Sequence, residues 1–461
     1  MIDVKEILKL KAEIVNGRHL TERGFKSVSI DSRKTSREIL FFGIKGENND
    51  GHRYIKELAR NGRINAAVVN KSWFEKEGKS IKGCAFIIVK DTVKTLGELA
   101  LIHRDEMNIP VVAIAGSNGK TTTKDLAAAV LSRKFKLHCT EGNLNNHIGL
   151  PLTLLGLNNK HDFCLLEAGS NHFNELEYLC GIAKPDAALV TNIGREHLEF
   201  FGNLAGVAKE EFQVYDWVRA NGSVCFYNHD DPFIRAYRRK AKEDSFTYSY
   251  GFSADVKGSI KGYDAKFRPV IEYAYNGRKQ KTYVNTFGRH SFYNGLAAIA
   301  LGVYFGVDAK EISDAFRNYS GGSSKRMQAE MKNGVLLIND AYNSNPDSVK
   351  LGLETVKEYS TKGRKHIILA DMLEMGKASE KEHYTNGKLA AEMKFDFLYT
   401  YGRDSYNTFK GAKKLKNNFY FETKDDLAEF VRKNIKKGDL VYVKGSRGMK
   451  LEEAIDKIFK N

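Results

Sequence analysis

The residue types that hold phosphate groups stand together in one stretch of the chain: Gly116, Ser117, Asn118, Gly119, Lys120, Thr121 and Thr122. Glycines let backbone N–H groups close around phosphate oxygens, and a lysine ammonium can reach the β- and γ-phosphates. A threonine hydroxyl can bind Mg²⁺. The strict phosphate-loop pattern has a further glycine where this chain has Ile114. An ordinary strand-to-helix turn is the alternative, but the strand predicted before the loop and the helix after it favour nucleotide binding.

Two more side chains of chemical interest follow apolar runs. Glu167 comes directly after one run, and His197 follows the end of another. Because the carboxyl ends of parallel strands meet at one edge of a sheet, we expect both side chains near Lys120. Glu167 is well placed as a Mg²⁺ ligand, with a helix cap or a surface position as the alternative. A lone histidine is more often structural, and Mg²⁺ prefers oxygen ligands.

The elements that must position these side chains alternate between strands and helices. Apolar runs of strand length, each followed by a polar or glycine-rich turn and a helix-like stretch, occupy Val111–Ala115, 162–166 and 187–191. This alternation predicts an α/β domain with a doubly wound, mostly parallel sheet of the phosphate-loop type. Residues 246–286 alternate in the manner of strands, and we expect them to add antiparallel strands.

Two predicted joints divide the chain into three domains. Helical spacing of apolar residues over 94–107 stops before Pro110, and Gly321-Gly322-Ser323-Ser324 has the composition of a flexible joint. Buried strands are again predicted after this joint, at 335–338, 366–369 and 439–443. The predicted domains are an N-terminal α/β domain (1–107), a central ATP-binding domain (108–319) and a C-terminal Rossmann-like α/β domain (320–461).

Composition narrows the class of protein. The 461 residues are 42% hydrophobic, which excludes global disorder, and no apolar run approaches the ~18 residues of a membrane helix. A net charge of +16 suits polyanionic small substrates, and no basic stretch is interleaved with aromatic residues as in nucleic-acid-binding motifs. Five scattered cysteines without a CxxC pair indicate reduced thiols. We therefore expect a cytoplasmic protein with no membrane span and no nucleic-acid partner.

Six further segments, in this order along the chain, give the sequence a wider resemblance: Ser29–Arg33, Phe41–His52, Gly142–Thr153, Asn339–Pro346, Asp371–Gly376 and Lys444–Lys450. Together with the phosphate loop they resemble the Mur ligase superfamily over nearly the whole chain. Members of that family join an amino acid or peptide to a carboxylate through an acyl phosphate made with ATP. In that family an isoleucine at position 114 is expected.

The resemblance points to the branch that adds D-alanyl-D-alanine to UDP-N-acetylmuramoyl-tripeptide in peptidoglycan precursor synthesis. It implies an enzyme that uses ATP and Mg²⁺, works as a monomer and binds the uridine nucleotide with its N-terminal domain. A related ligase that adds a single amino acid is the nearest alternative. An ATP-dependent switch without ligation is the alternative from another class.

The resemblance also implies roles for individual residues. The expected catalytic residues are Lys120, Glu167, His197 and Arg326. Expected nucleotide contacts, besides the phosphate loop, are Asn294 at the adenine, Asp340 at the ribose and Arg326 at the γ-phosphate. The expected metal ligands are Thr121, Glu167, His197 and Glu211. The expected substrate contacts are Ser32, Arg33, Lys45, Gly46, Asn145, Asn146, Asn343 and Asn345.

Two positions depart from the family pattern. His290-Ser291 stands where the family has His-Asn, which puts one adenine-side contact in doubt. Glu211 stands 14 residues after His197, where the family has a lysine that CO₂ carbamylates. Glutamate supplies the same charge with a shorter reach, so Glu211 is expected to replace the carbamate directly or through a water. The alternative is a solvent-facing helix residue and a loosely held second metal.

Overall fold

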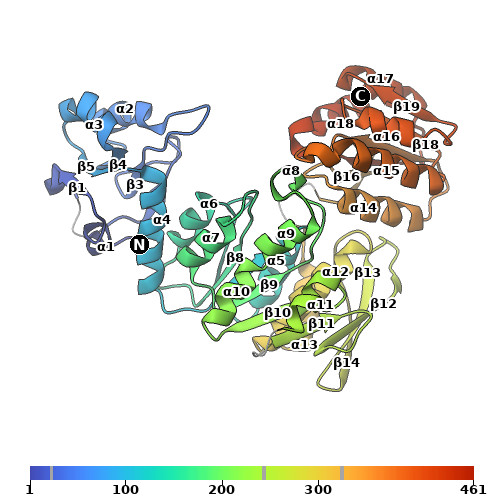
Figure 1. Cartoon of the computed structure of the whole chain (residues 1–461), viewed down its shortest axis with the longest axis horizontal. Coiled ribbons are helices and arrows are strands. Elements are labelled where there is room, and N and C mark those ends of the chain that lie inside the picture. Colours follow the sequence, from blue (N-terminus) through green and yellow to red (C-terminus); the bar gives the residue numbers. More distant parts are fainter. Residues whose placement is uncertain (21–23, 241–244, 322–325, 461) are drawn as a thin grey trace.

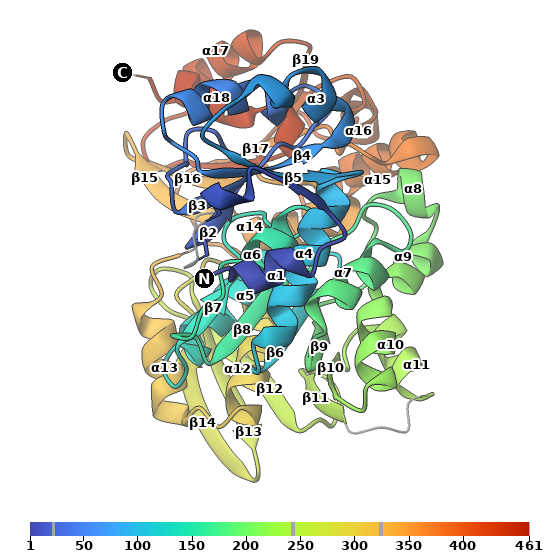
Figure 2. The same ribbon diagram turned by 90° about the vertical axis from the view of Figure 1, so that its left-hand side faces the viewer.

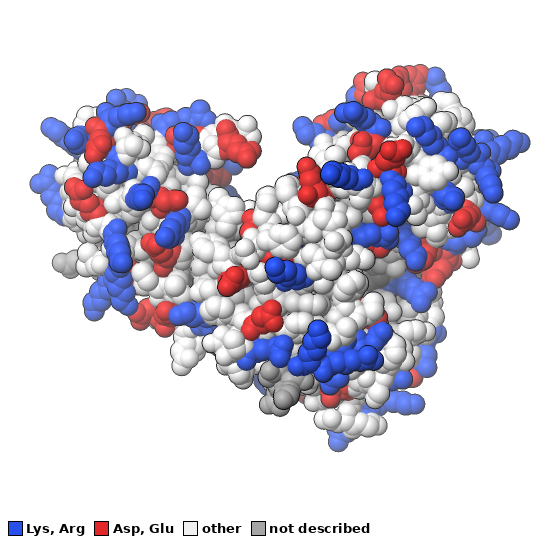
Figure 3. Space-filling view, in the orientation of Figure 1, with Lys and Arg blue, Asp and Glu red and all other residues white. Residues whose placement is uncertain are grey.

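The computed structural model describes residues 1–20, 24–240, 245–321 and 326–460. Three sheets, of five, nine and six strands, follow one another along the chain, and helices cover each of them (Figure 1). The N-terminal and C-terminal sheets stand on opposite sides of the central one. A space-filling view shows an open notch between these two outer parts (Figure 3). The predicted fold class, three α/β units with mostly parallel sheets, is confirmed.

The N-terminal sheet has the strand order β1-β5-β4-β3-β2. β2 to β5 run parallel, and β1 pairs with β5 in the antiparallel sense. Its strands are β1 (Glu13–Val15), β2 (Ser27–Ser29), β3 (Ile39–Phe42), β4 (Ala66–Asn70) and β5 (Ala85–Val89). Its helices are α1 (Val4–Leu8), α2 (Ile55–Arg60), α3 (Lys71–Lys76) and α4 (Thr92–Glu106).

The central sheet has the order β14-β13-β12-β11-β10-β9-β6-β8-β7. Its strands are β6 (Val111–Ala115), β7 (Leu137–Cys139), β8 (Phe163–Glu167), β9 (Ala187–Val190), β10 (Val224–Asn228), β11 (Ser245–Ser249), β12 (Val256–Tyr263), β13 (Pro269–Tyr275) and β14 (Arg278–Tyr283). β6 pairs in parallel with β8 on one side and β9 on the other. The strand order therefore reverses at β6, where open α/β sheets bind their ligands.

Helices lie on both faces of the central sheet, as the doubly wound pattern requires (Figures 1 and 2). They are α5 (Lys120–Leu131), α6 (Gly149–Leu154), α7 (Glu175–Ala183), α8 (Leu198–Phe201), α9 (Leu204–Glu211), α10 (Gln213–Ala220), α11 (Pro232–Arg238), α12 (His290–Tyr304) and α13 (Ala309–Asn318). Every residue of β6, β8 and β9 is buried, which accounts for their continuous apolar runs.

The prediction of antiparallel strands over 246–286 is wrong in part. β11 pairs in parallel with both β10 and β12, and only β12, β13 and β14 form antiparallel pairs. Alternation of polar and apolar residues reports which face of a strand is buried. It carries no information on the direction of the neighbouring strand, so the sequence pattern could not separate the two cases.

The C-terminal sheet has the order β15-β16-β20-β17-β18-β19, with β15 antiparallel and the rest parallel. Its strands are β15 (Gln328–Lys332), β16 (Val335–Asp340), β17 (Lys365–Ala370), β18 (Phe397–Tyr401), β19 (Asn418–Phe421) and β20 (Leu440–Lys444). Its helices are α14 (Pro346–Glu358), α15 (Ser379–Glu392), α16 (Ser405–Gly411), α17 (Lys424–Asn434) and α18 (Leu451–Ile458). β16, β17 and β20 confirm the three strands predicted from apolar runs.

The remaining sequence predictions concern the joint between domains, the domain boundaries, membrane helices and the cysteines. The flexible joint predicted at 321–324 lies outside the described residues except for Gly321, whose φ is +90°. The domain boundaries after residues 107 and 319 stay predictions. No helix in the described part of the chain is long and apolar enough to cross a membrane. All five cysteines lie in the described residues, and none of them forms a disulfide.

Candidate active site

The phosphate loop joins the buried end of β6 to the first turn of α5. Gly116 and Gly119 have φ values of +114° and +83°, a backbone region that favours glycine. A Cβ on Gly116 would lie 2.3 Å from Thr191 Oγ1, and one on Gly119 would lie 2.4 Å from Asn294 Oδ1. Both glycines are therefore required for the close packing of the loop. The N–H groups of the α5 N-terminus, with their positive dipole end, suit an anionic phosphate.

Lys120 begins α5 and lies among acidic side chains. Its Nζ donates a hydrogen bond to the carbonyl oxygen of Gly116 and another, of 3.3 Å, to Glu196 Oε2. Burial works against the charged ammonium, but the carboxylates of Glu196, Glu211 and Glu167 outweigh burial and raise the pKa of Lys120. Lys120 is therefore a partly buried cation that stays charged at neutral pH, as binding of a terminal phosphate requires.

Glu167 ends β8 and is only 2% exposed. One carboxylate oxygen, Oε1, accepts a hydrogen bond of 2.7 Å from Asn145 Nδ2. The other, Oε2, is buried and accepts no hydrogen bond from the described residues. A buried carboxylate oxygen without a donor is costly unless it has a cation to bind, so Glu167 fits the predicted Mg²⁺.

Glu211 ends α9 and is 1% exposed, so the alternative of a solvent-facing residue is wrong. Its Oε2 accepts the N–H of Gly116, which ties α9 to the phosphate loop. Burial raises the pKa of the Glu211 carboxyl to about 8, with Lys120 opposing and Glu196 adding to the rise. The preceding residue, Glu210, is also buried and accepts the backbone N–H groups of Asn174 and Leu176. This pair is therefore not a charged surface of the helix.

His197 lies in the loop between β9 and α8. Its Nε2 lies 3.9 Å from Glu196 Oε2, and its Nδ1 is bonded to Glu374 of the C-terminal domain. The imidazole therefore stands at the edge of the acidic cluster formed by Glu167, Glu196 and Glu211. Within the described residues, no three His, Cys, Asp or Glu side chains stand in a ligating arrangement. The Lys120 ammonium instead lies among the three carboxylates.

A cavity of about 450 Å³ opens beside the phosphate loop, between the central and C-terminal domains. Its size suits a small-molecule ligand. The predicted residues that line it are Ser117, Asn118, Gly119, Thr122, Asn294, Arg326, Asp340, Asn343 and Asn345. Thr121 is buried in the first turn of α5 and does not line this cavity. The structure therefore brings most of the predicted nucleotide contacts together, with Asn343 and Asn345 among them, whereas Gly116 and Lys120, like Thr121, do not line the cavity.

The cavity walls are held by hydrogen bonds. Asp340 Oδ2 accepts 2.8 Å and 3.1 Å bonds from Lys444 Nζ and the Tyr442 hydroxyl. On the central domain, Asn294 Oδ1 accepts a 3.2 Å bond from Thr123. Ser291, at the position that departs from the family pattern, is buried and donates to the Phe287 carbonyl oxygen at 3.1 Å. Its hydroxyl is therefore committed to its own helix turn.

The side chain of Arg326 lies over the ring of Tyr342, 4.5 Å from its centre, and Arg447 lies over the same ring at 5.1 Å. Arg326 Nε is buried and has no hydrogen-bond acceptor among the described residues. A buried N–H donor of this kind, at the wall of the cavity, suits an anionic ligand.

Other predicted contacts lie elsewhere. Ser32, Arg33, Lys45 and Gly46 belong to the N-terminal domain and do not line the cavity; Arg33 is exposed and pairs with Asp31 at 2.9 Å. Asn145 contacts Glu167, as described above. Asn146 Oδ1 accepts the N–H groups of Ile148 and Gly149, so it holds the turn that leads into α6.

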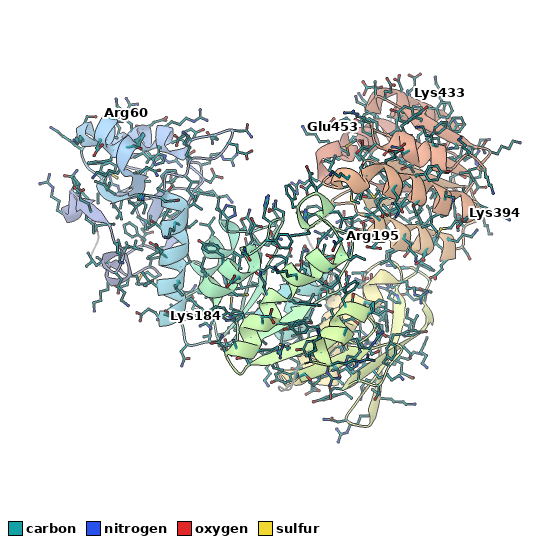
Figure 4. The ribbon with its side chains drawn as sticks, in the orientation of Figure 1. Arg60, Lys184, Arg195, Lys394, Lys433 and Glu453 are labelled. Carbon is teal, nitrogen blue, oxygen red and sulfur yellow. The ribbon has the colours of Figure 1, made fainter. Side chains whose placement is uncertain are left out.

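Sequence reasoning missed four residues at this site. Glu196 bonds Lys120, and its position directly before His197 was the available signal. Lys444 bonds Asp340 and lies in a segment that already marked the family. Arg195 donates to Asp347 and Glu382 of the C-terminal domain, with bonds of 2.6 Å and 2.9 Å (Figure 4). Glu374 pairs with His197 and also lies in a segment that marked the family, but the sequence held no signal for either of these contacts between domains.

Comparison with known proteins agrees with this geometry. Residues 114–302 match the Mur ligase middle domain, and residues 325–447 match the Mur ligase, glutamate ligase domain. The UDP-N-acetylmuramoyl-tripeptide–D-alanyl-D-alanine ligase of Bacillus subtilis (strain 168) is 33% identical over 475 residues, covering 99% of each chain. The chain belongs to the Mur ligase family.

Solved structures have the same fold. A crystal structure of MurF from Acinetobacter baumannii has a TM-score of 0.85 and 26% identity, covering 98% of this chain and 100% of that one. The MurF ligase from Thermotoga maritima, solved in complex with ADP, has a TM-score of 0.81. It covers 94% of this chain and 97% of its own, and its 23% identity shows the fold alone.

Proposed function

We propose that this chain is an ATP-dependent ligase that adds D-alanyl-D-alanine to UDP-N-acetylmuramoyl-tripeptide in peptidoglycan precursor synthesis. The observation that carries the proposal is the full-length, 33% identical match to the relative of that name. A cavity between two domains, lined by Ser117, Asn118 and Gly119 of the phosphate loop, supports it with chemistry. We expect the reaction to take place in the cytoplasm, on a monomer.

A free carboxylate does not react with an amine at a useful rate, because its oxygen is a poor leaving group. In the proposed reaction the terminal carboxylate of the tripeptide attacks the γ-phosphorus of ATP, which releases ADP and leaves an acyl phosphate. The amine of the dipeptide attacks the acyl carbon, and phosphate departs with the former carboxylate oxygen. Lys120 and the N–H groups at the start of α5 stabilise the charge on the transferring phosphoryl group.

The nucleotide is proposed to lie in the cavity between the domains. Asn294 would contact the adenine and Asp340 the ribose, while Arg326 would reach the γ-phosphate. Asn345 Nδ2 donates to Asn118 Oδ1 at 2.9 Å, so a C-terminal side chain already touches the phosphate loop. Acyl phosphates hydrolyse readily, and docking of the C-terminal domain would exclude water from the intermediate.

Thr121, Glu167, His197 and Glu211 are the side chains proposed to hold Mg²⁺. Bound Mg²⁺ supplies positive charge that offsets the negative charge of the phosphate oxygens. Glu211 stands in place of a carbamylated lysine, and its position beside Lys120 supports a direct role; its carboxyl, which burial favours in the protonated form, would lose its proton when Mg²⁺ binds. Its carboxylate needs no CO₂, so we expect wild-type turnover to be independent of added bicarbonate.

The test of the function is an assay of purified protein with ATP, Mg²⁺, UDP-N-acetylmuramoyl-tripeptide and D-alanyl-D-alanine, read by product mass. We expect a UDP-muramoyl pentapeptide, with phosphate release that requires both the tripeptide and the dipeptide. Product with D-alanine alone would favour the related single-amino-acid ligases. Phosphate release that ignores the amine would favour the switch, and absence of any ligated product contradicts the proposal.

The role of Glu211 has its own test. Glu211→Ala should lose most turnover and weaken the dependence on Mg²⁺, whereas Glu211→Lys should recover activity only when bicarbonate is supplied. Wild-type protein in CO₂-depleted buffer is the control. Unchanged turnover and Mg²⁺ dependence in Glu211→Ala contradict the role of this residue and leave the ligase assignment intact.

A further inference from the structure

The loop that follows β17 in the C-terminal domain is seated on α8 of the central domain. The Glu374 carbonyl oxygen accepts a 3.1 Å hydrogen bond from the N–H of Glu199. Gly376 packs so closely that a Cβ there would lie 2.9 Å from Glu199 Cα. This contact therefore depends on the backbones of both domains and holds the loop in one register.

The contact also involves unusual backbone conformations. Glu374 has a φ of +61° and His197 a φ of +46°, and both are non-glycine residues in the left-handed region. Such residues persist only where the surrounding structure demands them, and they gather at functional sites. Here two of them, from different domains, bring their side chains together.

The side chains are joined by a hydrogen bond between His197 Nδ1 and Glu374 Oε2. Their side chains are 21% and 47% exposed, so the pair contributes little to stability. Its effect is on orientation. A carboxylate only accepts hydrogen bonds, so Nδ1 of His197 carries the proton and the ring is fixed with Nε2 toward Glu196, 3.9 Å away.

We propose that Glu374 is a positioning residue, through which docking of the C-terminal domain orients His197 for cation binding beside Lys120. The inference rests on the proposed function, because it takes His197 to be a metal ligand. Histidines that bind metals regularly donate their second ring N–H to a carboxylate, which fixes the tautomer and the ring orientation. In this chain that carboxylate comes from another domain, so the metal site is complete only when the two domains are docked.

Arg195 provides the contrast that makes the inference testable. Its guanidinium also crosses the domain joint, to Asp347 and Glu382, but it has no bond to His197. A residue that merely fastens the domains should act on metal binding whether or not His197 is present. A positioning residue should act only through the imidazole.

The experiment measures Mn²⁺ binding by electron paramagnetic resonance in the presence of ADP, with no turnover involved. Glu374→Ala should weaken the protein's Mn²⁺ binding about 10- to 100-fold, the usual effect of removing such a carboxylate. Glu374→Gln should retain most of the affinity, because its amide oxygen still accepts from Nδ1. Glu380→Gln, an exposed carboxylate in the first turn of α15, is the matched control and should bind as wild type.

The decisive comparison repeats Glu374→Ala in a His197→Ala background, where it should have no further effect. Equal weakening in both backgrounds, wild-type affinity in Glu374→Ala, or no Mn²⁺ bound beyond that held by ADP each overturns the inference. If Glu374→Ala unfolds, as judged by circular dichroism, Glu374→Leu takes its place in the same cycle, because leucine has no acceptor for Nδ1. Glu374→Gln, which keeps an acceptor, remains the comparison. Because no ligation is measured, a failure of product formation bears on the proposed function alone.

Discussion

The central domain has two joints, and they differ in the share of polar contacts that each contains. At the N-terminal joint α4 lies against α6 and α7 (Figures 1 and 2), and Leu96, Leu99 and Ala100 of α4 are completely buried in a core shared with both helices. His103, also fully buried, bonds Glu6 at 2.8 Å and the Leu157 carbonyl oxygen at 3.0 Å. Nothing in this joint can slide without opening a packed core.

At the C-terminal joint many contacts are polar and partly exposed, although Tyr359 also packs against the rings of Phe267 and Phe287. Arg195 pairs with Asp347 and Glu382, and Arg289 and Tyr263 both reach Glu358. Exposed ion pairs exchange with water at a cost near 0–1 kcal/mol each. From this difference we expect the N-terminal domain to move with the central domain as one body, and the C-terminal domain to dock and undock over the nucleotide cavity.

The largest predicted effect is the loss of stability when His103 is removed from the N-terminal joint. His103→Ala leaves the Glu6 carboxylate and the Leu157 carbonyl buried without their partner, so we expect a loss of about 3–5 kcal/mol in the free energy of unfolding. Urea denaturation measures it. His147→Ala removes an exposed histidine and should change stability by less than about 0.5 kcal/mol. A loss at position 103 no larger than the control would show that this joint is not locked.

The next prediction concerns a substitution that weakens the C-terminal joint. Arg195→Ala removes two ion pairs that bridge the domains, and we expect ligation to fall about tenfold, or about 1.4 kcal/mol in transition-state stabilisation. Its thermal midpoint should stay close to that of wild type. Lys184→Ala breaks an exposed pair with Asp105 at the locked joint and serves as the control (Figure 4). Equal turnover in both variants would argue against docking through Arg195.

A third prediction concerns pH and the acidic cluster of the central domain. Because the pKa of Glu211 is raised to about 8 in the folded chain, its stabilising contribution is complete below the ordinary glutamate pKa and is lost as pH rises through 8. Glu211→Gln cannot ionise. Relative to wild type, its thermal midpoint should rise by several °C between pH 5 and pH 8.5, because one pKa unit is worth about 1.4 kcal/mol and this range covers about three of them. A constant difference across that range contradicts the buried protonated carboxyl.

The smallest predicted effect concerns His366 in the C-terminal domain, whose contribution to stability is lost on acidification, whereas that of Glu211 is lost on alkalinisation. His366 is fully buried, bonded to Asp439 and to the Tyr399 hydroxyl, and burial lowers its pKa although the Asp439 bond opposes this. Its contribution is present above the ordinary histidine pKa of ~6.5 and is lost as pH falls below it. The stability deficit of His366→Gln should therefore shrink from pH 8 to pH 5.5 in calorimetry. A stability deficit of His366→Gln that grows as pH falls would contradict this prediction.

The sequence predicted what depends on neighbours along the chain. The phosphate loop, the strands before Glu167 and His197, and the buried runs of the C-terminal sheet were all visible, because burial imposes continuous apolar stretches on parallel strands. Asp340 and Asn294 were placed through the family resemblance, and the structure brings both to the cavity wall.

What the sequence could not predict are contacts between distant residues. Arg195 and Asp347 are 152 residues apart, and His197 and Glu374 are 177 apart. Neither pair has a spacing or composition that marks it, since its geometry arises only after two domains have folded. The burial of Glu211 was undecidable for the same reason: a glutamate pair at a helix end is usually a solvated surface.

The loop between β9 and α8 sends successive side chains to different places. Arg195 and His197 turn to the C-terminal domain, while Glu196 between them turns inward to Lys120. A single inserted or deleted residue would turn Glu196 toward the C-terminal domain and one of its neighbours toward Lys120. Lys120 would then lose its carboxylate partner. Segments of this loop can therefore be grafted between ligases only at equal length, whatever residues they carry.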